Sequence, residues 1–393
     1  MADPVLYVLS RFGRLSETFI LTELAGLEQR GERVLVDALN PPETGPRHPA
    51  AARLRVQARH LPTKPTMGDR TVAACHLRWA LRRPSTWLAL ARRARRAGSW
   101  RQFLQAGLVA ERVRQERVRH VHAHFASRSA EVARDAAALA GVPFSVTAHA
   151  YDIYRADHAP HVAERTQGAA AVVTVSQHNV EHLRTVLPPS TVVSLIPNGM
   201  PLPDGHGPTS GGPLLCVARL VAKKGVDTVL AALADLPPDV LLEIVGAGPL
   251  DGELRALAEQ LGVSPRVRFL GAQDSTAVDA AYRRAAAVVL APRIAANGDR
   301  DGLPTVFLEA LARGVPVVST DIVGIREVVQ HGRTGLLVPP DDVPALTTAL
   351  RRLLADPALG ERLGRAGRSW VAEHHDPARS AAVLSTLMSG EAA

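Results

Sequence analysis

The fold is decided by the stretch Leu214-Leu215-Cys216-Val217-Ala218-Arg219-Leu220-Val221-Ala222-Lys223-Lys224-Gly225. An apolar run of strand length is followed at once by a basic loop, and a helix is expected over 226–235. The same alternation of strand and helix signals recurs along most of the chain, which is typical of parallel sheets with crossover helices. We therefore predict an α/β protein.

The alternation predicts two similar halves. In the first half, strands are expected at 5–10, 33–38, 119–124, 143–147, 171–176 and 192–196, with helices at 17–30 and 127–140. In the second, strands are expected at 214–218, 241–245, 266–270, 287–291, 315–319 and 335–338, with helices at 226–235, 250–262, 276–285, 305–313, 324–330, 342–355 and 378–388. Residues 40–66 are rich in proline and are expected to form a mobile loop.

The length favours two domains. A chain of 393 residues exceeds one ordinary α/β core. Residues 197–213 hold five prolines and five glycines, the composition of a linker. We predict an N-terminal domain at 1–198, a linker at 199–213 and a C-terminal domain at 214–375.

Composition limits the cellular setting. No uninterrupted apolar run reaches the roughly 18 residues of a transmembrane helix, and the N-terminus lacks a basic leader. Two cysteines cannot form a disulfide framework or a cysteine-based zinc site. We expect the protein in the reducing cytoplasm, either free or at the inner face of the membrane.

The net charge of +8 is concentrated in one segment. Residues 78–101 contain eight arginines and no acid, together with Trp79, Trp87 and Trp100. Two interpretations stay open: a surface that meets anionic lipid or an anionic acceptor, or a solvated helix pair that packs its Trp and Leu residues inward. Nucleic acid is disfavoured because no nucleic-acid motif accompanies the charge.

The richest motif is Asp301-Gly302-Leu303-Pro304-Thr305-Val306-Phe307-Leu308-Glu309-Ala310. Pro304 suits the first turn of a helix, and the loop before it brings free backbone N–H groups to a helix N-terminus, which binds phosphate and sugar oxygens well. Glu309 lies one turn beyond Thr305 on the same helical face. Two acids so placed can accept hydrogen bonds from two sets of sugar hydroxyls.

Two further segments of the second half follow predicted strands. Arg219 and Lys224 are expected at the carboxyl end of a strand, where α/β sheets bind ligands, and together they can neutralise a departing diphosphate without a metal. Gly246 and Gly248 form a short glycine turn, although Pro249 and the missing third glycine exclude a dinucleotide fingerprint. Leu270, at the end of the strand 266–270, completes this donor-binding set.

Histidines end two strands of the first half. His122 and His124 share one face of a strand, and His149 ends the next strand, followed by Tyr151. Three clustered histidines raise zinc as an option, but no cysteine or acid stands at ligand spacing, so we predict no metal and no cofactor.

These motifs resemble the family-4 retaining glycosyltransferases of the GT-B type over essentially the whole chain, most strongly at 214–340. The resemblance implies two Rossmann-like domains facing across a cleft, with 376–393 returning to the first domain. It implies that Arg219 and Lys224 hold the donor diphosphate and that Glu309 binds the ribose hydroxyls. Asp301, where the family more often has Glu, inherits the donor-sugar contact. His149 matches the cleft histidine beside the anomeric carbon.

The N-terminal run Ser10-Arg11-Phe12-Gly13-Arg14-Leu15-Ser16-Glu17-Thr18-Phe19-Ile20 resembles the start of bacterial polysaccharide glycosyltransferases, which natural-product enzymes share. Gly13 permits close approach to the donor. Ser16 and Glu17, with His124 and Tyr151, are expected to contact the acceptor, although Ser16 also suits a helix cap.

The expected activity is that of a retaining, metal-independent hexosyltransferase. The donor is a nucleotide sugar, UDP-linked by preference and GDP-mannose next, and the acceptor is a saccharide, a lipid-linked saccharide or a small natural product. The alternatives are a sugar-nucleotide epimerase or phosphorylase on the same fold and an inactive nucleotide-sugar-binding scaffold. A nicotinamide oxidoreductase is disfavoured by the missing fingerprint.

Overall fold

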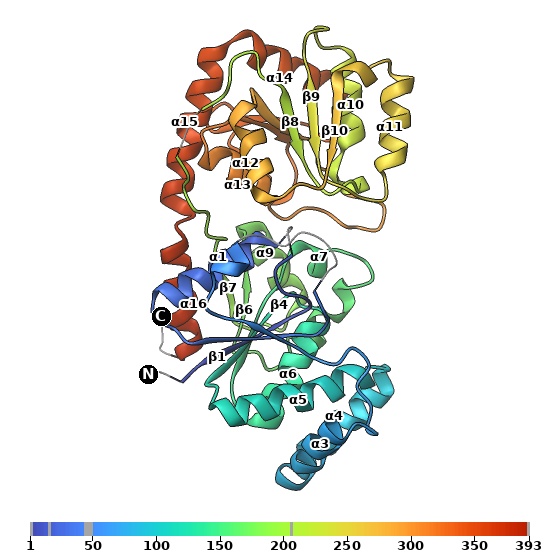
Figure 1. Ribbon diagram of the computed structural model, residues 1–393, viewed down its shortest axis with the longest axis vertical. Helices are drawn as coiled ribbons and strands as arrows, with labels where there is room; N and C mark the ends of the chain where they lie inside the picture. The colour runs from blue at the N-terminus through green and yellow to red at the C-terminus, as the bar shows by residue number, and fades with distance from the viewer. Residues whose placement is uncertain (1–2, 15–16, 43–49, 205–206, 391–393) are drawn as a thin grey trace. The chain divides into compact units, whose positions relative to one another are not determined.

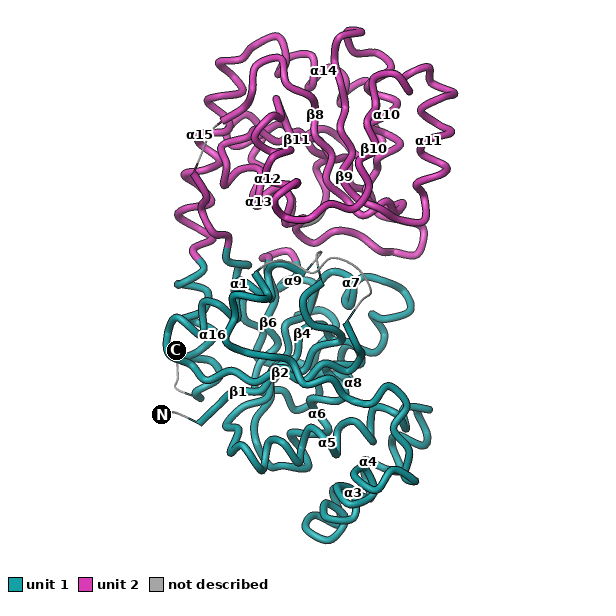
Figure 2. Tube along the Cα trace, in the orientation of Figure 1, with its two compact units in different colours: residues 1–175, 179–199, 377–393 teal, residues 176–178, 200–376 magenta. Residues whose placement is uncertain are grey.

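The computed structural model describes residues 3–14, 17–42, 50–204 and 207–390. They form two compact units (Figure 2): unit 1 comprises residues 1–175, 179–199 and 377–393, and unit 2 comprises residues 176–178 and 200–376. Each unit is a parallel sheet covered by helices (Figure 1), which confirms the predicted α/β class with two Rossmann-like domains. Among the described residues, no helix combines the length and hydropathy needed to span a bilayer.

Unit 1 is built on seven parallel strands in the order β3-β2-β1-β4-β5-β6-β7. The strands are β1 Val5–Leu9, β2 Val34–Ala38, β3 Ala58–His60, β4 His120–His124, β5 Phe144–Thr147, β6 Ala171–Thr174 and β7 Val193–Leu195. The helices are α1 Thr18–Gln29, α2 Ala50–Arg53, α3 Arg70–Arg82, α4 Pro84–Ala97, α5 Trp100–Glu116, α6 Arg128–Ala140, α7 Ala150–Ile153, α8 Val162–Arg165, α9 Gln177–Val186 and α16 Pro377–Ser389.

The last helix, α16, belongs to unit 1 although unit 2 precedes it in the chain. Leu384 and Met388 of α16 are buried in the same core cluster as Leu24 and Leu27 of α1. A Cβ added at Gly26 would lie 2.8 Å from the Cβ of Ala381, so α1 and α16 touch closely. Unit 1 is therefore assembled from two ends of the described sequence.

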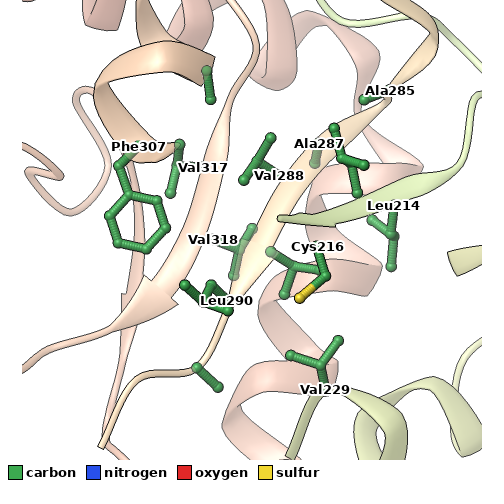
Figure 3. Packing of buried hydrophobic residues seen from close by; sticks show 14 of the residues in the cluster. Leu214, Cys216, Val229, Ala285, Ala287, Val288, Leu290, Phe307, Val317 and Val318 are labelled. Atoms are coloured by element: carbon green, nitrogen blue, oxygen red, sulfur yellow. The ribbon is translucent and has the colours of Figure 1, made fainter. Parts of the chain in front are cut away.

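Unit 2 is built on six parallel strands in the order β10-β9-β8-β11-β12-β13. The strands are β8 Leu214–Val217, β9 Leu242–Val245, β10 Val267–Gly271, β11 Ala287–Leu290, β12 Val317–Thr320 and β13 Gly335–Val338. The helices are α10 Val226–Ala234, α11 Asp251–Gln260, α12 Ser275–Arg284, α13 Thr305–Ala312, α14 Val343–Ala355 and α15 Pro357–His374. Figure 3 shows strand residues such as Cys216 and Leu290 packed with helix residues such as Val229 in its core.

Three sequence expectations were wrong. Residues 40–66 are not one loop, because they contain the edge strand β3, paired in register with β2, and the short helix α2; residues 43–49 lie outside the described residues. The helix expected at 324–330 is a 3-10 turn over Val323–Glu327, where Gly324 passes close to the carbonyl oxygen of Gly302. The 18-residue helix α15 was not anticipated at all.

Candidate active site

The strand order of unit 2 reverses between β8 and β11, which are neighbours in the sheet. Arg219 and Lys224 follow β8, and the segment with Asp301 follows β11. In open α/β sheets, ligands bind beyond the carboxyl ends of the strands at such a switch point. The motif with Arg219 and Lys224 and the segment with Asp301 thus lie at the switch point, where folds of this kind bind ligands.

An ionic cluster joins these two motifs. Lys224 Nζ lies 2.7 Å from Asp301 Oδ2, and Lys223 Nζ lies 2.9 Å from Asp299 Oδ1 and 3.4 Å from Asp301 Oδ1. Burial alone would raise the pKa of Asp301, but the ammonium groups of Lys224 and Lys223 outweigh it and leave that pKa below its usual value. Sequence reasoning singled out neither Lys223 nor Asp299; the only signal for Lys223 was its place in the Lys pair.

Arg219 is exposed, and among the residues described its side chain has no hydrogen bond or ion pair. Its loop is held by the glycine turn instead. A Cβ at Gly246 would lie 1.8 Å from the carbonyl oxygen of Ala218, and one at Gly248 would lie 2.3 Å from that of Leu220. The two glycines therefore allow the backbone of residues 218–220 to pass close to the turn, and this contact positions the loop that carries Arg219.

Leu270, which the sequence analysis assigns to donor binding, lies beside this glycine turn. It sits half-buried in β10, where the register with β9 shifts between Phe269 and Gly271. The amide of Gly246 donates to the carbonyl oxygen of Gly271 at 2.8 Å, so the end of β10 is tied to the turn.

Helix α13 begins at Thr305, directly after Gly302, Leu303 and Pro304, and no side chain caps its N-terminus. Glu309 lies half-buried in its second turn, where Tyr282 Oη donates to Oε2 at 2.9 Å. Burial raises the pKa of Glu309 above its ordinary value. The other oxygen of this carboxylate has no partner among the described residues, so it can accept a hydrogen bond.

His149 lies beyond the carboxyl end of β5 in unit 1 and is 8% exposed. Its ring packs against those of Phe19 and Phe125, with centroids 4.8 and 4.6 Å away. Burial lowers the pKa of His149 to about 3, so its imidazole is neutral at neutral pH. Asp152 Oδ2 accepts from the amides of His149 and Ala126 at 3.2 and 2.9 Å and fixes the turn.

A chain of buried polar groups continues behind His149. His124 Nδ1 lies 3.2 Å from His149 Nε2, and His124 Nε2 lies 2.9 Å from Glu23 Oε1. Tyr7 Oη donates to the same Glu23 oxygen at 2.7 Å. Sequence reasoning placed His124 at the acceptor and missed Glu23, which comes from α1.

His122 shares the face of His124, with ring centroids 5.2 Å apart. Its Nδ1 lies 2.7 Å from Ser145 Oγ and its Nε2 3.0 Å from Thr147 Oγ1. Ligand atoms of Glu23, His122 and His124 fall within 4.8 Å of one another, a spacing that a metal could use. Hydrogen bonds nevertheless account for every ring nitrogen of both histidines, so this cluster is complete as a polar network.

The remaining residues that the sequence analysis assigns to the donor or the acceptor lie in the first loop and at Tyr151. Gly13 has φ +81°, a left-handed conformation that favours glycine. Glu17 pairs with Arg14 at 2.9 Å, while Ser16 lies outside the described residues. Tyr151 Oη accepts from Arg155 at 3.1 Å.

The arginine-rich segment 78–101 comprises the end of α3, all of α4 and the start of α5. Trp79 and Leu90 are buried, as inward packing predicts, but Leu81 and Leu88 are 75% and 42% exposed. The hypothesis of inward packing thus fails for these two leucines. Leu77, just before the segment, is 62% exposed as well. The helices α3 and α4 extend away from the sheet of unit 1 (Figure 1).

The second unit matches a known family. The family model described as "Glycosyl transferases group 1" matches residues 209–370. Residues 209–370 are thus similar to the group 1 glycosyl transferases. The domain thus defined contains the Arg219, Lys224, Asp301 and Glu309 motifs, and the predicted resemblance to GT-B glycosyltransferases is confirmed.

Curated relatives carry related names. A GDP-mannose-dependent alpha-(1-6)-phosphatidylinositol monomannoside mannosyltransferase of Mycolicibacterium smegmatis is 34% identical over 56% of the chain and 63% of its own length. The Mycobacterium tuberculosis protein of that name is 37% identical over 48% of the chain and 49% of its own length. The chain thus spans less than two thirds of these relatives. WcaL of Salmonella typhimurium, which is described as a colanic acid biosynthesis glycosyltransferase, is 28% identical over 88% of this chain and 89% of its own length.

Solved structures share the fold along the whole chain. Anabaena HepE, in complex with UDP and glucose, has a TM-score of 0.75 at 18% identity and covers 99% of this chain and 100% of its own. Sucrose-phosphate synthase from Thermosynechococcus elongatus has a TM-score of 0.72 at 19% identity over 98% of both chains.

Proposed function

We propose that the chain transfers a hexosyl or N-acetylhexosaminyl group from a nucleoside diphosphate sugar to an acceptor hydroxyl. The observation that carries this proposal is the Lys224–Asp301 ion pair of 2.7 Å, which brings two motifs of a glycosyl transferase domain together at a switch point. The sequence analysis favours a UDP-linked donor. The relatives named as GDP-mannose-dependent make GDP its direct competitor.

We propose retention of configuration without a metal. The departing diphosphate takes the proton of the acceptor hydroxyl, and the protein supplies position and charge. Arg219, Lys224 and the uncapped N-terminus of α13 stabilise the diphosphate charge. Glu309 accepts from the ribose hydroxyls, Asp301 accepts from the donor sugar, and Gly302, Leu303, Pro304 and Thr305 line the phosphates.

Arg219 is the sharpest residue for a test because its removal breaks no bond inside the described fold. Calorimetric titration of UDP, GDP and ADP in EDTA compares the wild type with Arg219→Ala and Glu309→Gln. A charge-assisted hydrogen bond contributes about 1.5–3 kcal/mol, so each variant should bind the preferred nucleotide roughly 10–100-fold more weakly.

The matched control is Arg362→Ala, which removes another exposed arginine, on α15, without a partner among the described residues. It should bind like the wild type. A folded wild type that binds no nucleotide would overturn the proposal, and so would an Arg219→Ala variant that binds like Arg362→Ala.

Product analysis separates the other enzyme classes. A transferase releases nucleotide only as acceptor is glycosylated. An epimerase leaves a changed sugar on the nucleotide, a phosphorylase needs inorganic phosphate, and a scaffold binds nucleotide sugar without turnover.

We propose that the acceptor is reached at an anionic membrane surface through α3 and α4. Leu77 and Leu81 lie one turn apart on the exposed face of α3, flanked by Arg82, and Leu88 is exposed on α4 beside Arg92. Exposed leucines bordered by arginines suit the boundary between lipid head groups and acyl chains.

Sedimentation with phosphatidylglycerol vesicles tests this partner. The wild type should bind them and leave phosphatidylcholine vesicles unbound, and Leu77→Ser/Leu81→Ser should lose binding at least tenfold, because burial of one leucine contributes about 1.5–3 kcal/mol. Leu202→Ser, also an exposed leucine in the chain, is the control. Equal binding by the double variant and this control would reject the membrane contact.

A further inference from the structure

We propose that Lys223 is a positioning residue that holds Asp301 for the donor sugar, so that the neighbouring Lys224 can bind the donor diphosphate. The proposal rests on the proposed function, in which Asp301 accepts a hydrogen bond from the sugar and Lys224 faces the diphosphate. Two lysines that adjoin in sequence then have separate tasks, and Asp299 acts as the partner of Lys223.

Lysine is rare in this chain, and two of its three lysines adjoin at this site. Of the 46 basic residues, three are lysines (Lys64, Lys223 and Lys224) and the others are arginines. Lys223 and Lys224 share one ionic cluster with Asp299 and Asp301. An ammonium group is a compact charge on a flexible stem, whereas a guanidinium group is a broad planar fork. Two cations beside one buried carboxylate therefore favour the smaller group.

Lys223 is bound to both ends of the segment that leads to Asp301. Its backbone carbonyl oxygen accepts from the amide of Arg293 at 2.9 Å. Its Nζ donates to Asp299 Oδ1 at 2.9 Å and to the carbonyl oxygen of Arg300 at 3.3 Å, and lies 3.4 Å from Asp301 Oδ1. These three oxygen atoms are as many as the protons that an ammonium group can donate. Because Lys223 is also buried, it cannot reach a ligand without releasing this segment.

Lys224 has fewer contacts than Lys223. Its one ionic partner among the described residues is Asp301 Oδ2 at 2.7 Å, and this buried oxygen has no hydrogen bond within the same part of the chain. Lys224 therefore keeps donors for a diphosphate. When Lys224 turns toward the diphosphate, Lys223 still neutralises Asp301 and fixes its Oδ1, while Oδ2 becomes the acceptor for a sugar hydroxyl.

The charge of the cluster determines which variant tests this role. Lys223 and Lys224 balance the charges of Asp299 and Asp301. Lys223→Met alone would leave a buried acid unpaired and make the cluster negative, which would weaken diphosphate binding for a reason unrelated to position. Lys223→Met/Asp299→Asn removes one charge of each sign and nearly preserves the side-chain volumes, so the cluster stays neutral.

This double variant should bind the sugar nucleotide less well but bind the free nucleotide normally. In calorimetric titration with UDP and GDP in EDTA, its affinity should stay within about threefold of the wild type, because Lys224 and the cluster charge are kept. With UDP-glucose, UDP-N-acetylglucosamine and GDP-mannose, its affinity for the sugar nucleotide that the wild type prefers should fall about 10–100-fold, as expected for one lost charge-assisted hydrogen bond. Arg284→Met/Glu243→Gln removes another ion pair of unit 2, of 2.6 Å, and should bind like the wild type.

Asp301→Ala tests whether Lys223 acts through Asp301. In that background the sugar contact is already absent, so adding Lys223→Met/Asp299→Asn should lower sugar-nucleotide affinity by less than about threefold further. An equal loss in both backgrounds would mean that Lys223 only supports the fold, and it would overturn the proposal. A parallel loss of free-nucleotide affinity in the double variant would overturn it as well.

The wild type offers a test that does not depend on the folding of the double variant. Lysine-specific ¹⁵N labelling of the full chain gives three side-chain signals, which Lys64→Arg and Lys224→Gln assign by loss. Titration with UDP or GDP should shift the Nζ signal of Lys224 more than that of Lys223. A larger shift for Lys223 would overturn the division of roles.

The outcomes separate the two proposals. If the folded wild type binds neither nucleotide nor sugar nucleotide, the proposed function fails. If the wild type binds both and the double variant binds the sugar nucleotide equally well, only the role of Lys223 fails.

Discussion

Replacing Gly364 tests how helix α15 is seated in unit 2. A Cβ at this position would lie 1.8 Å from the carbonyl oxygen of Gly314, in the connection between α13 and β12. The clash is with backbone, so no side-chain rotation relieves it, and α15 must move by roughly 1 Å or more to reach ordinary contact.

Two opposing effects determine how much Gly364→Ala changes the unfolding free energy of unit 2. Overpacking of this kind costs about 1–3 kcal/mol, and a rigid backbone contact places Gly364→Ala at the upper end. Alanine recovers about 0.5–1 kcal/mol of helix propensity. We expect a net loss of roughly 2 kcal/mol in the unfolding free energy of unit 2, or a fall of about 4–8 °C in its Tm.

Gly360 provides the matched control in the same helix. A Cβ there meets its nearest atoms at 3.6–3.8 Å, which is ordinary contact, so Gly360→Ala should gain about 0.5–1 kcal/mol. Urea unfolding followed by circular dichroism measures both variants. If Gly364→Ala proves as stable as Gly360→Ala, the close seating of α15 against Gly314 is wrong. Because α13 carries Glu309, nucleotide affinity should fall in Gly364→Ala only.

Three further predictions concern burial and titration. Phe307→Ala, at a fully buried position, should lower the unfolding free energy by about 3–5 kcal/mol in urea titration. Burial raises the pKa of Asp152 to about 7, so the folded chain holds a proton that the unfolded chain loses; stability should fall as pH rises from about 4 to about 7, and Asp152→Asn should flatten that urea midpoint profile. Because the pKa of Glu309 is raised, nucleotide affinity measured by calorimetry should decline on acidification already above pH 4.5, and Glu309→Gln should abolish this decline. A wild-type stability that does not change between pH 4 and pH 7 would contradict the Asp152 prediction. A wild-type nucleotide affinity that does not change on acidification would contradict the Glu309 prediction.

The sequence predicted the strands well because most of them are buried runs with clear boundaries. In β8, Leu214, Leu215 and Cys216 are all buried, and the basic loop ends the strand. The edge strand β3 escaped notice because its three residues are half-buried or exposed, and it is held by β2 and by the Arg59–Asp37 ion pair. Such support comes from tertiary pairing, which local composition does not carry.

The residues of the candidate site likewise fall into two groups, those that local sequence predicts and those that only the tertiary structure reveals. Arg219, Lys224, Asp301 and Glu309 stand in local motifs beside strand and helix boundaries, so their chemistry can be inferred from spacing. Glu23 has no local signal, because its partner His124 is 101 residues away. The pairing of Lys224 with Asp301 likewise depends on β8 and β11 being neighbours, which only the sheet order reveals.

The placement of α16 on α1 has a consequence for synthesis. Unit 1 lacks one wall of its core until residues 377–389 leave the ribosome, and residues 200–376 must be made first. At about 5–20 residues per second, this interval lasts roughly 10–40 s. During that time the apolar face of α1, with Leu24 and Leu27, is not covered by α16, while unit 2 can already fold. The core of unit 1 is therefore completed only after unit 2 has been made.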